Sequence, residues 1–328
     1  MNPHLPQACP GLLAGWRFHA GGPPQPLEGD DATAAMVAGE TGLWLHFDLL
    51  DQRARATIAT LPLPPAALAA LLEADDAPHL DAADGVICGT VPDFHFNIDP
   101  KASLDMALLH LALTPGLLVT ARRHPLNVVG GIARNPPAGA HQGAALGAIL
   151  DGLAVAAGRA LQAMADRLAR LEDALLRNPD LPAERVALAA LRRDALRLER
   201  NFGATAEALV EFEAEPPEGM EEETFVPTLR AARRFGTLLR NLSALKERAR
   251  IAQDELAGLL GEQTNQRLFV LSVISAVMLP PALIAGIFGM NVGELPGVDV
   301  PWGFAMSMGL ILASILGVLG ALRWWRLM

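Results

Sequence analysis

The sequence is poor in cysteine and in charge. It has only two cysteines in 328 residues, Cys9 and Cys88, which are too few for a disulfide framework or a four-thiolate zinc site. Charged residues make up 19% of the chain, and 36 acidic residues outnumber 26 Lys and Arg, giving a formal net charge of -10. Because the phosphate backbone of nucleic acid attracts a basic surface, we expect no nucleic acid partner.

The common sequence motifs of enzymes are also missing. The chain has no Gly-x-Ser-x-Gly, no His-Glu-x-x-His, no dinucleotide-binding fingerprint and no phosphate-binding loop of the Gly-x4-Gly-Lys-Ser/Thr kind. We therefore expect a protein that is not an enzyme, that holds no cofactor and that does not hydrolyse ATP.

Apolar residues are abundant, at 51%, and they concentrate near the C-terminus. The run Leu268–Gly293 has no ionisable side chain, and as a helix it would reach roughly 39 Å against a bilayer core of ~30 Å. A second uncharged run, Val300–Leu322, follows it. We expect transmembrane helices at 268–290 and 302–322, joined by an external loop at 291–301.

The placement of basic residues predicts the orientation in the membrane. Arg and Lys precede the first span and occur again in the tail, 323–328, whereas the loop between the spans has none. Trp302, Trp324 and Trp325 stand where interfacial aromatic anchors belong. We therefore expect a multi-pass protein of the cell (inner) membrane, in contact with lipid, with both termini in the cytoplasm.

The rest of the chain has two patterns. Residues 1–135 alternate β-like runs with Pro, Gly and Asp, which predicts a cytoplasmic α/β domain. The expected strands are Trp16–His19, Leu43–Asp48, Gly85–Val91, Ala107–Leu113 and Leu117–Ala121, and the expected helix is Pro64–Glu73. Residues 136–227 predict a cytoplasmic helical hairpin, with helices from Ala144 to Arg177 and from Pro182 to about Glu213.

An acidic tract, Glu211–Glu223, occupies the expected tip of this hairpin, and the Pro216–Pro217 pair breaks the helix inside it. A solvated helix tip and a cation-attracting or regulatory surface are both consistent with such a tract.

A stretch without proline, Thr228–Leu279, predicts one very long helix. Its 52 residues would span roughly 78 Å. This length exceeds that of an ordinary globular helix, so we expect a stalk at 228–267 that continues without interruption into the first, pore-lining span.

Small and polar residues form a stripe along this helix, at alternating steps of four and three. The stripe is Asp254, Gly258, Gly261, Asn265, Leu268, Ser272, Ser275, Leu279, Ala282 and Gly286. Such a stripe is consistent with close packing of two helices or with a water-lined path. We favour the water-lined path, because the charge of Asp254 is poorly suited to a dry seam. A single hairpin cannot enclose a pore, so this path requires several copies around an axis.

The first span ends in Phe288-Gly289-Met290-Asn291-Val292-Gly293-Glu294. The glycines allow tight turns that expose backbone carbonyls, and Asn291 offers a neutral carbonyl oxygen. Neutral oxygens suit a hydrated hard cation that must bind weakly enough to leave. We therefore expect Gly289, Met290, Asn291 and Glu294 at the ion entrance.

This segment resembles the CorA family of divalent-cation transporters, whose signature is Gly-Met-Asn after a proline-containing first span, here Leu279-Pro280-Pro281 to Asn291. The resemblance extends to the expected architecture of the whole chain. It implies a homopentamer in which the first spans line the pore and Asn291 binds the hydrated ion. It also implies a cytoplasmic gating role at the stalk position of Asp254.

Within the family, Asn-Val-Gly-Glu-Leu-Pro-Gly is similar to the loop of the ZntB-type branch, Asn-x-Gly-Gly-x-Pro-Gly, from which Glu294 departs. The magnesium branch usually has Glu where this chain has Gly293, and often Thr where it has Ala282. The resemblance favours Zn2+ as the transported ion, with proton coupling. The alternatives are a Mg2+, Co2+ or Ni2+ channel, or a non-conducting membrane scaffold.

All eight histidines lie at or before His141, so an ion in the membrane would meet oxygen ligands only. His46 and Asp48 are two residues apart, as are Asp93 and His95, and each pair shares one face of a strand if the chain is extended. Ordinary polar strand residues are the favoured interpretation, and a bound regulatory metal is the other.

Overall fold

The structure is a computed structural model that describes residues 9–20, 22–73, 77–95, 105–139, 141–177, 182–215, 218, 222–290 and 302–324. Its contacts divide the chain into two compact units, Met1–Gln253 and Asp254–Met328. Each unit is described by itself.

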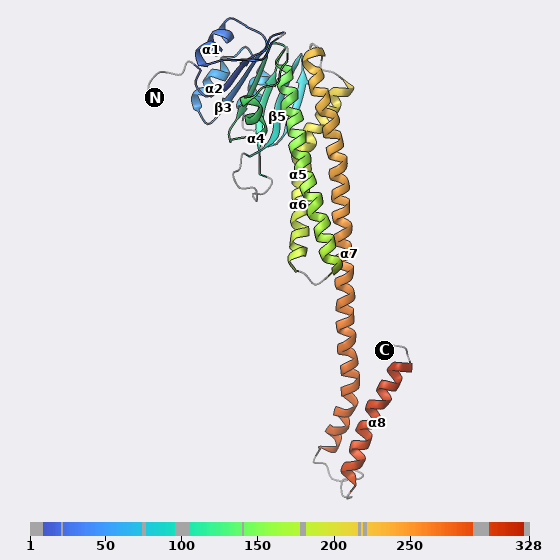
Figure 1. Ribbon diagram of the computed structural model, residues 1–328. Helices are drawn as coiled ribbons and strands as arrows, with labels where there is room; N and C mark the ends of the chain where they lie inside the picture. Colours follow the sequence, from blue (N-terminus) through green and yellow to red (C-terminus); the bar gives the residue numbers. More distant parts are fainter. Residues whose placement is uncertain are drawn as a thin grey trace. The chain divides into compact units, whose positions relative to one another are not determined.

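A mixed sheet of seven strands forms the centre of the first unit (Figure 1). The strand order is β2-β1-β3-β7-β6-β5-β4. Only β3 and β7 pair in parallel; the other neighbours are antiparallel. The strands are β1 (Leu12–Arg17), β2 (Gln25–Pro26), β3 (Leu43–Asp48), β4 (His79–Ala83), β5 (Val86–Phe94), β6 (Met106–Leu113) and β7 (Leu117–Arg122).

Three short helices cover one face of the sheet, namely α1 (Gly29–Val37), α2 (Gln52–Ala59) and α3 (Pro65–Leu72). Leu43, Leu45 and Phe47 alternate along β3 towards this face and are buried. Ala54 and Ile58 of α2 lie in the same core cluster. Burial of large side chains at this interface supplies the main driving force for the α/β fold.

The opposite face is covered by α4 (Asn127–Arg134), α5 (Gly143–Arg177) and α6 (Pro182–Ala214) (Figure 1). The Trp16 indole N–H of β1 donates to the carbonyl oxygen of Ala133 in α4 at 2.9 Å. A Cβ at Gly152 of α5 would meet Val128 Cγ1 at 2.7 Å, so the absence of a side chain there lets α4 approach closely. The α/β fold expected for this part of the chain is confirmed.

The longest element is α7, a single helix of 67 residues from Glu222 to Phe288. At about 1.5 Å per residue it is roughly 100 Å long. It includes the whole range for which one continuous helix was expected, and it continues through Pro280 and Pro281. The shorter helix α8 (Gly303–Trp324) follows it in the second unit.

Within the first unit, apolar and ionic contacts hold α7 to its neighbours. The ring of Phe202 in α6 lies between Phe94 of β5 and Phe235 of α7, with both centroid distances at 5.9 Å. Ion pairs join Arg234 to Asp151 of α5 and Lys246 to Glu199 of α6. Because these pairs are partly exposed, the buried rings contribute more to stability than the charges do.

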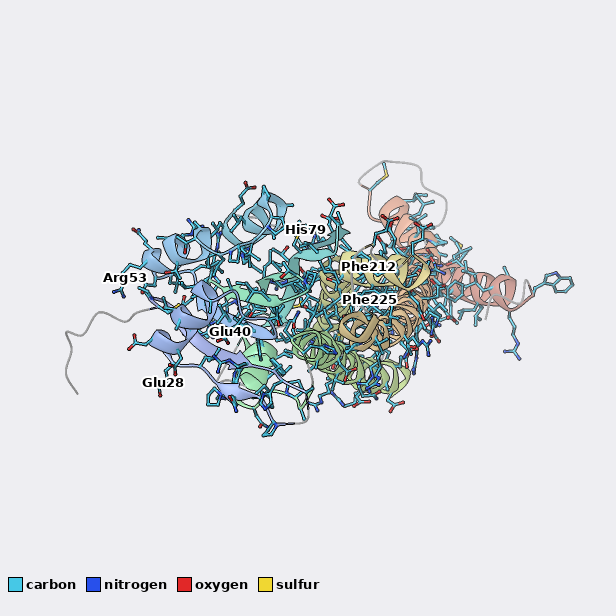
Figure 2. The ribbon with its side chains drawn as sticks, turned by 90° about the horizontal axis from the view of Figure 1, so that it is seen from above. Glu28, Glu40, Arg53, His79, Phe212 and Phe225 are labelled. Carbon is cyan, nitrogen blue, oxygen red and sulfur yellow. The ribbon has the colours of Figure 1, made fainter. Side chains whose placement is uncertain are left out.

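The acidic tract, Glu211–Glu223, begins in the last turn of α6 and ends in the first turn of α7. Helix α6 ends at Ala214, and Pro216–Pro217 lie outside the described residues. Across this junction, Phe212 and Phe225 have ring centroids 6.3 Å apart (Figure 2). The aromatic contact therefore anchors both helices next to the tract.

A buried polar network crosses from β3 to β7. Thr120 Oγ1 lies 2.9 Å from His46 Nδ1 and also accepts a hydrogen bond of 2.9 Å from the Trp44 indole N–H. Burial and, to a smaller extent, the positive charge of Arg122 lower the pKa of His46 to about 3, against the opposing effect of a hydrogen bond to the Thr120 backbone. The folded protein therefore keeps this imidazole neutral.

The network predicts a specific pH dependence of stability. An unfolded His46 takes up a proton below about pH 6.5, whereas the folded one does so only near pH 3. The stability due to neutral His46 is therefore complete above about pH 6.5 and is lost as the pH falls towards 3. At pH 5 the loss should be about 2 kcal/mol.

Urea unfolding of the detergent-purified chain at several pH values measures this loss. His46→Asn keeps a hydrogen-bonding atom near Thr120 but does not titrate. Its free energy of unfolding should fall less steeply than that of the wild type between pH 6.5 and 5. Parallel curves for the two proteins would contradict the assignment.

Candidate ion pathway

The small-polar stripe lies on an open face of α7. All ten of its residues, from Asp254 to Gly286, are exposed in the single chain. A Cβ added at Gly258, Gly261 or Gly286 would meet nothing within 4 Å. Among the described residues, no contact therefore accounts for the absence of a side chain at these three glycines.

A different face of α7 packs within the second unit. Partial burial recurs along one face of α7 and along one face of α8. The residues are Val273, Val277, Ile284 and Phe288 of α7, and Met306, Ile311, Ile315 and Val318 of α8. We interpret these two partly buried faces, made of Val, Ile, Phe and Met side chains, as the seam between α7 and α8, which leaves the stripe for other contacts.

Hydroxyl groups on the stripe are partly satisfied by the helix itself. Ser275 Oγ donates to the carbonyl oxygen of Leu271 at 2.9 Å. Such a bond to the preceding turn satisfies the hydroxyl donor, while the oxygen lone pairs stay open to the outside. Ser275 can therefore offer an acceptor to water or to a hydrated cation.

Two prolines leave backbone carbonyl oxygens in the same region without their helical hydrogen-bond donors. Pro280 and Pro281 have no N–H to donate, so the carbonyl groups of Ala276 and Val277 lose their usual helical partners. In an apolar surrounding each free carbonyl is costly unless water, an ion or another helix contacts it. These oxygens add polar groups about three turns before the end of α7 at Phe288.

The helix ends at the expected ion entrance. The backbone N–H of Gly289 donates to Ala285 at 2.9 Å, and that of Met290 donates to Ile287 at 3.3 Å. Asn291 and Glu294 lie outside the described residues. Their role at the entrance stays a prediction, as does the role of Asp254, which is exposed at the start of the second unit.

The four candidate metal ligands of the sheet are not gathered in one place. His46 is buried against Thr120, and Asp48 Oδ1 accepts from the backbone N–H of Leu50 at 2.9 Å. Among the described residues there is no group of three or more His, Cys, Asp and Glu that could hold a metal. A metal role for these residues stays a prediction.

Asp93 is fully buried and its carboxylate faces α4. One oxygen accepts from the N–H of Val128 at 3.1 Å and the other from Val129 at 2.9 Å, both in the first turn of the helix. Burial raises the pKa of Asp93 to about 6, although these hydrogen bonds and that of Phe94 lower it. The carboxylate thus fixes the start of α4.

His95 has a neighbour that the sequence did not reveal. Its ring lies 5.2 Å, between centroids, from that of His124. The two residues are far apart in the chain and share no local pattern, so only the pairing of the strands brings them together.

Three helices among the described residues are long and apolar enough to span a membrane: Gly143–Leu175, Phe225–Phe288 and Gly303–Trp324. The most apolar window of the first is 50% buried inside the protein, whereas that of each other helix is 0% buried. The exposed apolar surfaces of α7 and α8 therefore need a cover, which lipid would supply.

An α/β unit followed by two apolar helices without a buried window has the organisation of a membrane protein. The family model described as "CorA-like Mg2+ transporter protein" matches residues 39–325. The chain therefore belongs to this family.

Named relatives match most of the chain. It is 25% identical over 296 residues to the zinc transport protein ZntB of Yersinia enterocolitica, covering 89% of this chain and 88% of the relative. It is 24% identical over 323 residues to ZntB of Klebsiella pneumoniae, covering 96% and 94%.

Solved structures share the fold. The full-length CmaX protein has a TM-score of 0.79 at 21% identity, covering 99% of this chain and 100% of that one. The CorA magnesium transporter of Methanocaldococcus jannaschii has a TM-score of 0.73 at 18% identity, covering 94% and 96%. The ZntB cytoplasmic domain of Vibrio parahaemolyticus has a TM-score of 0.61 at 15% identity, covering 77% and 99%.

The interpretation of the stripe as a water-lined path predicts a pattern of thiol reactivity in the membrane. Cysteines at Ser272 and Ser275 should react with a charged, membrane-impermeant thiol reagent at least roughly tenfold faster than a cysteine at Ile274, because thiolates form only in contact with water. The background is Cys88→Ser, since Cys9 is buried. Equal rates at the three positions would contradict a wet stripe.

Proposed function

We propose that this chain transports divalent metal cations across the membrane through an axial pore formed by several copies. The observation that carries the proposal is the small-polar stripe. It is exposed in the single chain, lies apart from the seam with α8, and leads to Gly289-Met290-Asn291. Membership of the CorA-like family supports the same function.

Five copies around an axis would turn the stripes towards one another. The copy number comes from the resemblance to the family; the need for more than two helices comes from geometry, because one hairpin cannot surround a water column. In this arrangement Asn265, Leu268, Ser272, Ser275, Leu279, Ala282 and Gly286 line the pore. The partners are then other copies of this chain, lipid and the transported cation.

Zn2+ is the favoured ion, because named relatives along most of the chain are zinc transport proteins. A Mg2+, Co2+ or Ni2+ channel is the alternative, and the family description favours magnesium. The proposed pore residues, Asn265 to Gly286, offer amide, hydroxyl and backbone carbonyl oxygens and no imidazole or thiolate, and the carboxylates of Asp254 and Glu294 lie only at the two ends of the path. Such ligands hold a hydrated ion weakly, which suits passage more than storage.

The membrane potential can drive uptake if both termini face the cytoplasm. A potential that is negative inside contributes about 2.3 kcal/mol per charge per 100 mV, and roughly twice that for a divalent ion. The orientation follows from the basic residues that flank the two expected spans.

Proton coupling would have to rely on groups outside the two uncharged runs. Neither uncharged run, Leu268–Gly293 nor Val300–Leu322, contains Asp, Glu or His. A proton would have to move through water, with Glu294 and Asp299 of the expected loop as the nearest carboxylates.

Removal of the proposed entrance ligand should abolish transport but leave the assembly intact. We expect Asn291→Ala to reduce zinc uptake into proteoliposomes at least about tenfold, which corresponds to about 1.4 kcal/mol in ion stabilisation at the entrance. Size-exclusion chromatography should show the same assembly as the wild type. The matched control is Asn241→Ala, which changes an exposed asparagine in the first-unit part of α7.

Unchanged flux in Asn291→Ala would remove the entrance assignment. Absence of flux in the wild-type protein as well would favour a non-conducting scaffold.

The identity of the ion and its coupling can be tested in one flux experiment. With Zn2+ as the substrate, a hundredfold excess of Mg2+ should leave zinc uptake largely unchanged, because the ZntB-like loop lacks the Glu of the magnesium branch. Strong inhibition by Mg2+ would support the alternative channel. An uptake rate that does not vary with an imposed pH gradient would reject proton coupling.

A further inference from the structure

His95 and His124 form a pair of imidazoles at one end of the sheet. His95 follows β5, and His124 lies in the segment between β7 and α4. Their ring centroids are 5.2 Å apart and the ring planes are inclined by 46°, so the rings are not stacked in parallel. His124 is exposed and His95 is partly exposed, so solutes can reach both rings.

The backbone under both residues is held in place. His95 forms an isolated antiparallel bridge with Leu126, and its N–H donates to the carbonyl oxygen of Asp105 at 2.9 Å. Pro125 restricts the backbone of His124 to extended conformations. Two residues after Leu126, the first turn of α4 is bound by the carboxylate of Asp93.

The spacing of the rings matches that of two ligands on one tetrahedral metal ion. A Zn–N bond is about 2 Å long, and the ring centre lies about 1.2 Å beyond the nitrogen, so each ring centre stands about 3.2 Å from the metal. At a tetrahedral angle, two such ring centres are about 5.2 Å apart. This agrees with the observed separation of 5.2 Å.

We propose that His95 and His124 form a binding site for a transition-metal dication, with water in the remaining coordination positions. Imidazole nitrogen suits Zn2+, Co2+, Ni2+ and Cu2+, whereas Mg2+ prefers oxygen. Among the described residues no third His, Cys, Asp or Glu completes a cluster here. With two protein ligands the site binds reversibly.

The site is separate from the proposed pore and would meet the ion only after transport. It belongs to the first unit, whereas the stripe belongs to the second. That it faces the cytosol rests on the proposed function, but metal binding by the two histidines does not. Asp93 is not a ligand in this arrangement, because its oxygens accept hydrogen bonds from the first turn of α4.

Occupation of the site would have a structural consequence. The metal would join the end of β5 to the segment that leads into α4, and α4 packs closely on Gly152 of α5. Zinc should therefore reduce amide hydrogen exchange in the first turn of α4.

The test measures the binding of Zn2+ to the detergent-purified full chain by equilibrium dialysis. We compare the wild type with His95→Ala, His124→Ala and the double variant. Each single variant should lose one bound Zn2+ per chain, and the loss should be the same in both. Its affinity at the proposed site should be at least about tenfold weaker than that of the wild type. The double variant should lose no more, because both rings serve one ion. Millimolar Mg2+ should not displace the bound Zn2+ from the wild-type protein.

Three controls keep the result interpretable. His19→Ala changes another partly exposed histidine and should bind Zn2+ like the wild type. His124→Cys, which replaces an exposed side chain by another zinc ligand, should retain binding. Asn291→Ala should keep this site whether or not transport fails, which separates the inference from the proposed function. Wild-type binding in both single variants, or additive losses from two independent sites, would overturn the proposal.

Discussion

The constraint on which the proposed function depends is that an apolar helix with one polar face cannot leave that face in lipid. Hydrocarbon offers no partner to hydroxyl, amide or free carbonyl groups, so each such group needs protein or water. In α7 the seam with α8 uses branched and aromatic side chains, and the small-polar stripe lies elsewhere. Association of several chains is the direct way to cover the stripe, and an enclosed water column is the natural content of a surface made of Gly, Ser and Asn.

Because α7 is so long, one helix takes part both in the core of the first unit and in the proposed ion pathway. The same helix that contributes Phe235 to the core of the first unit carries Ser272 and Ser275 on the stripe. No loop interrupts α7 between Phe235 and the stripe, so the helix has no hinge there. A shift of α7 against α5 and α6 could therefore be passed along the helix to the stripe. The free carbonyl groups of Ala276 and Val277 are the weakest part of this path, since two successive helical hydrogen bonds are missing there.

The sequence predicted the elements with a clear period and missed those without one. The strand Leu43–Asp48 is correct to the residue, because Gly42 precedes its run of large side chains and Asp48 interrupts it. The first strand begins at Leu12 and not at Trp16, since a bulge beside Leu12 and Ala14 hides its alternation. Helices α1, α2 and α4 and strands β2 and β4 went unrecognised, because they are short and gain their stability from the sheet. The stripe could be found from spacing alone, whereas the proximity of His95 to His124 depends on strand pairing that no local pattern encodes.

Oxygen ligands and histidines lie in different parts of the chain, and the two kinds of ligand suit different tasks. An ion that crosses a membrane must leave each position quickly, so a path lined by neutral oxygens is favourable and an imidazole would hold Zn2+ too long. All eight histidines of this chain lie at or before His141, outside the two uncharged runs. At the proposed site, where two of them lie 5.2 Å apart, retention would be no disadvantage, because the ion would already have left the pore. The two proposals thus assign different ligands to the same cation. Oxygen atoms on α7 would let the ion pass, and imidazoles beyond the ends of two inner strands would hold it.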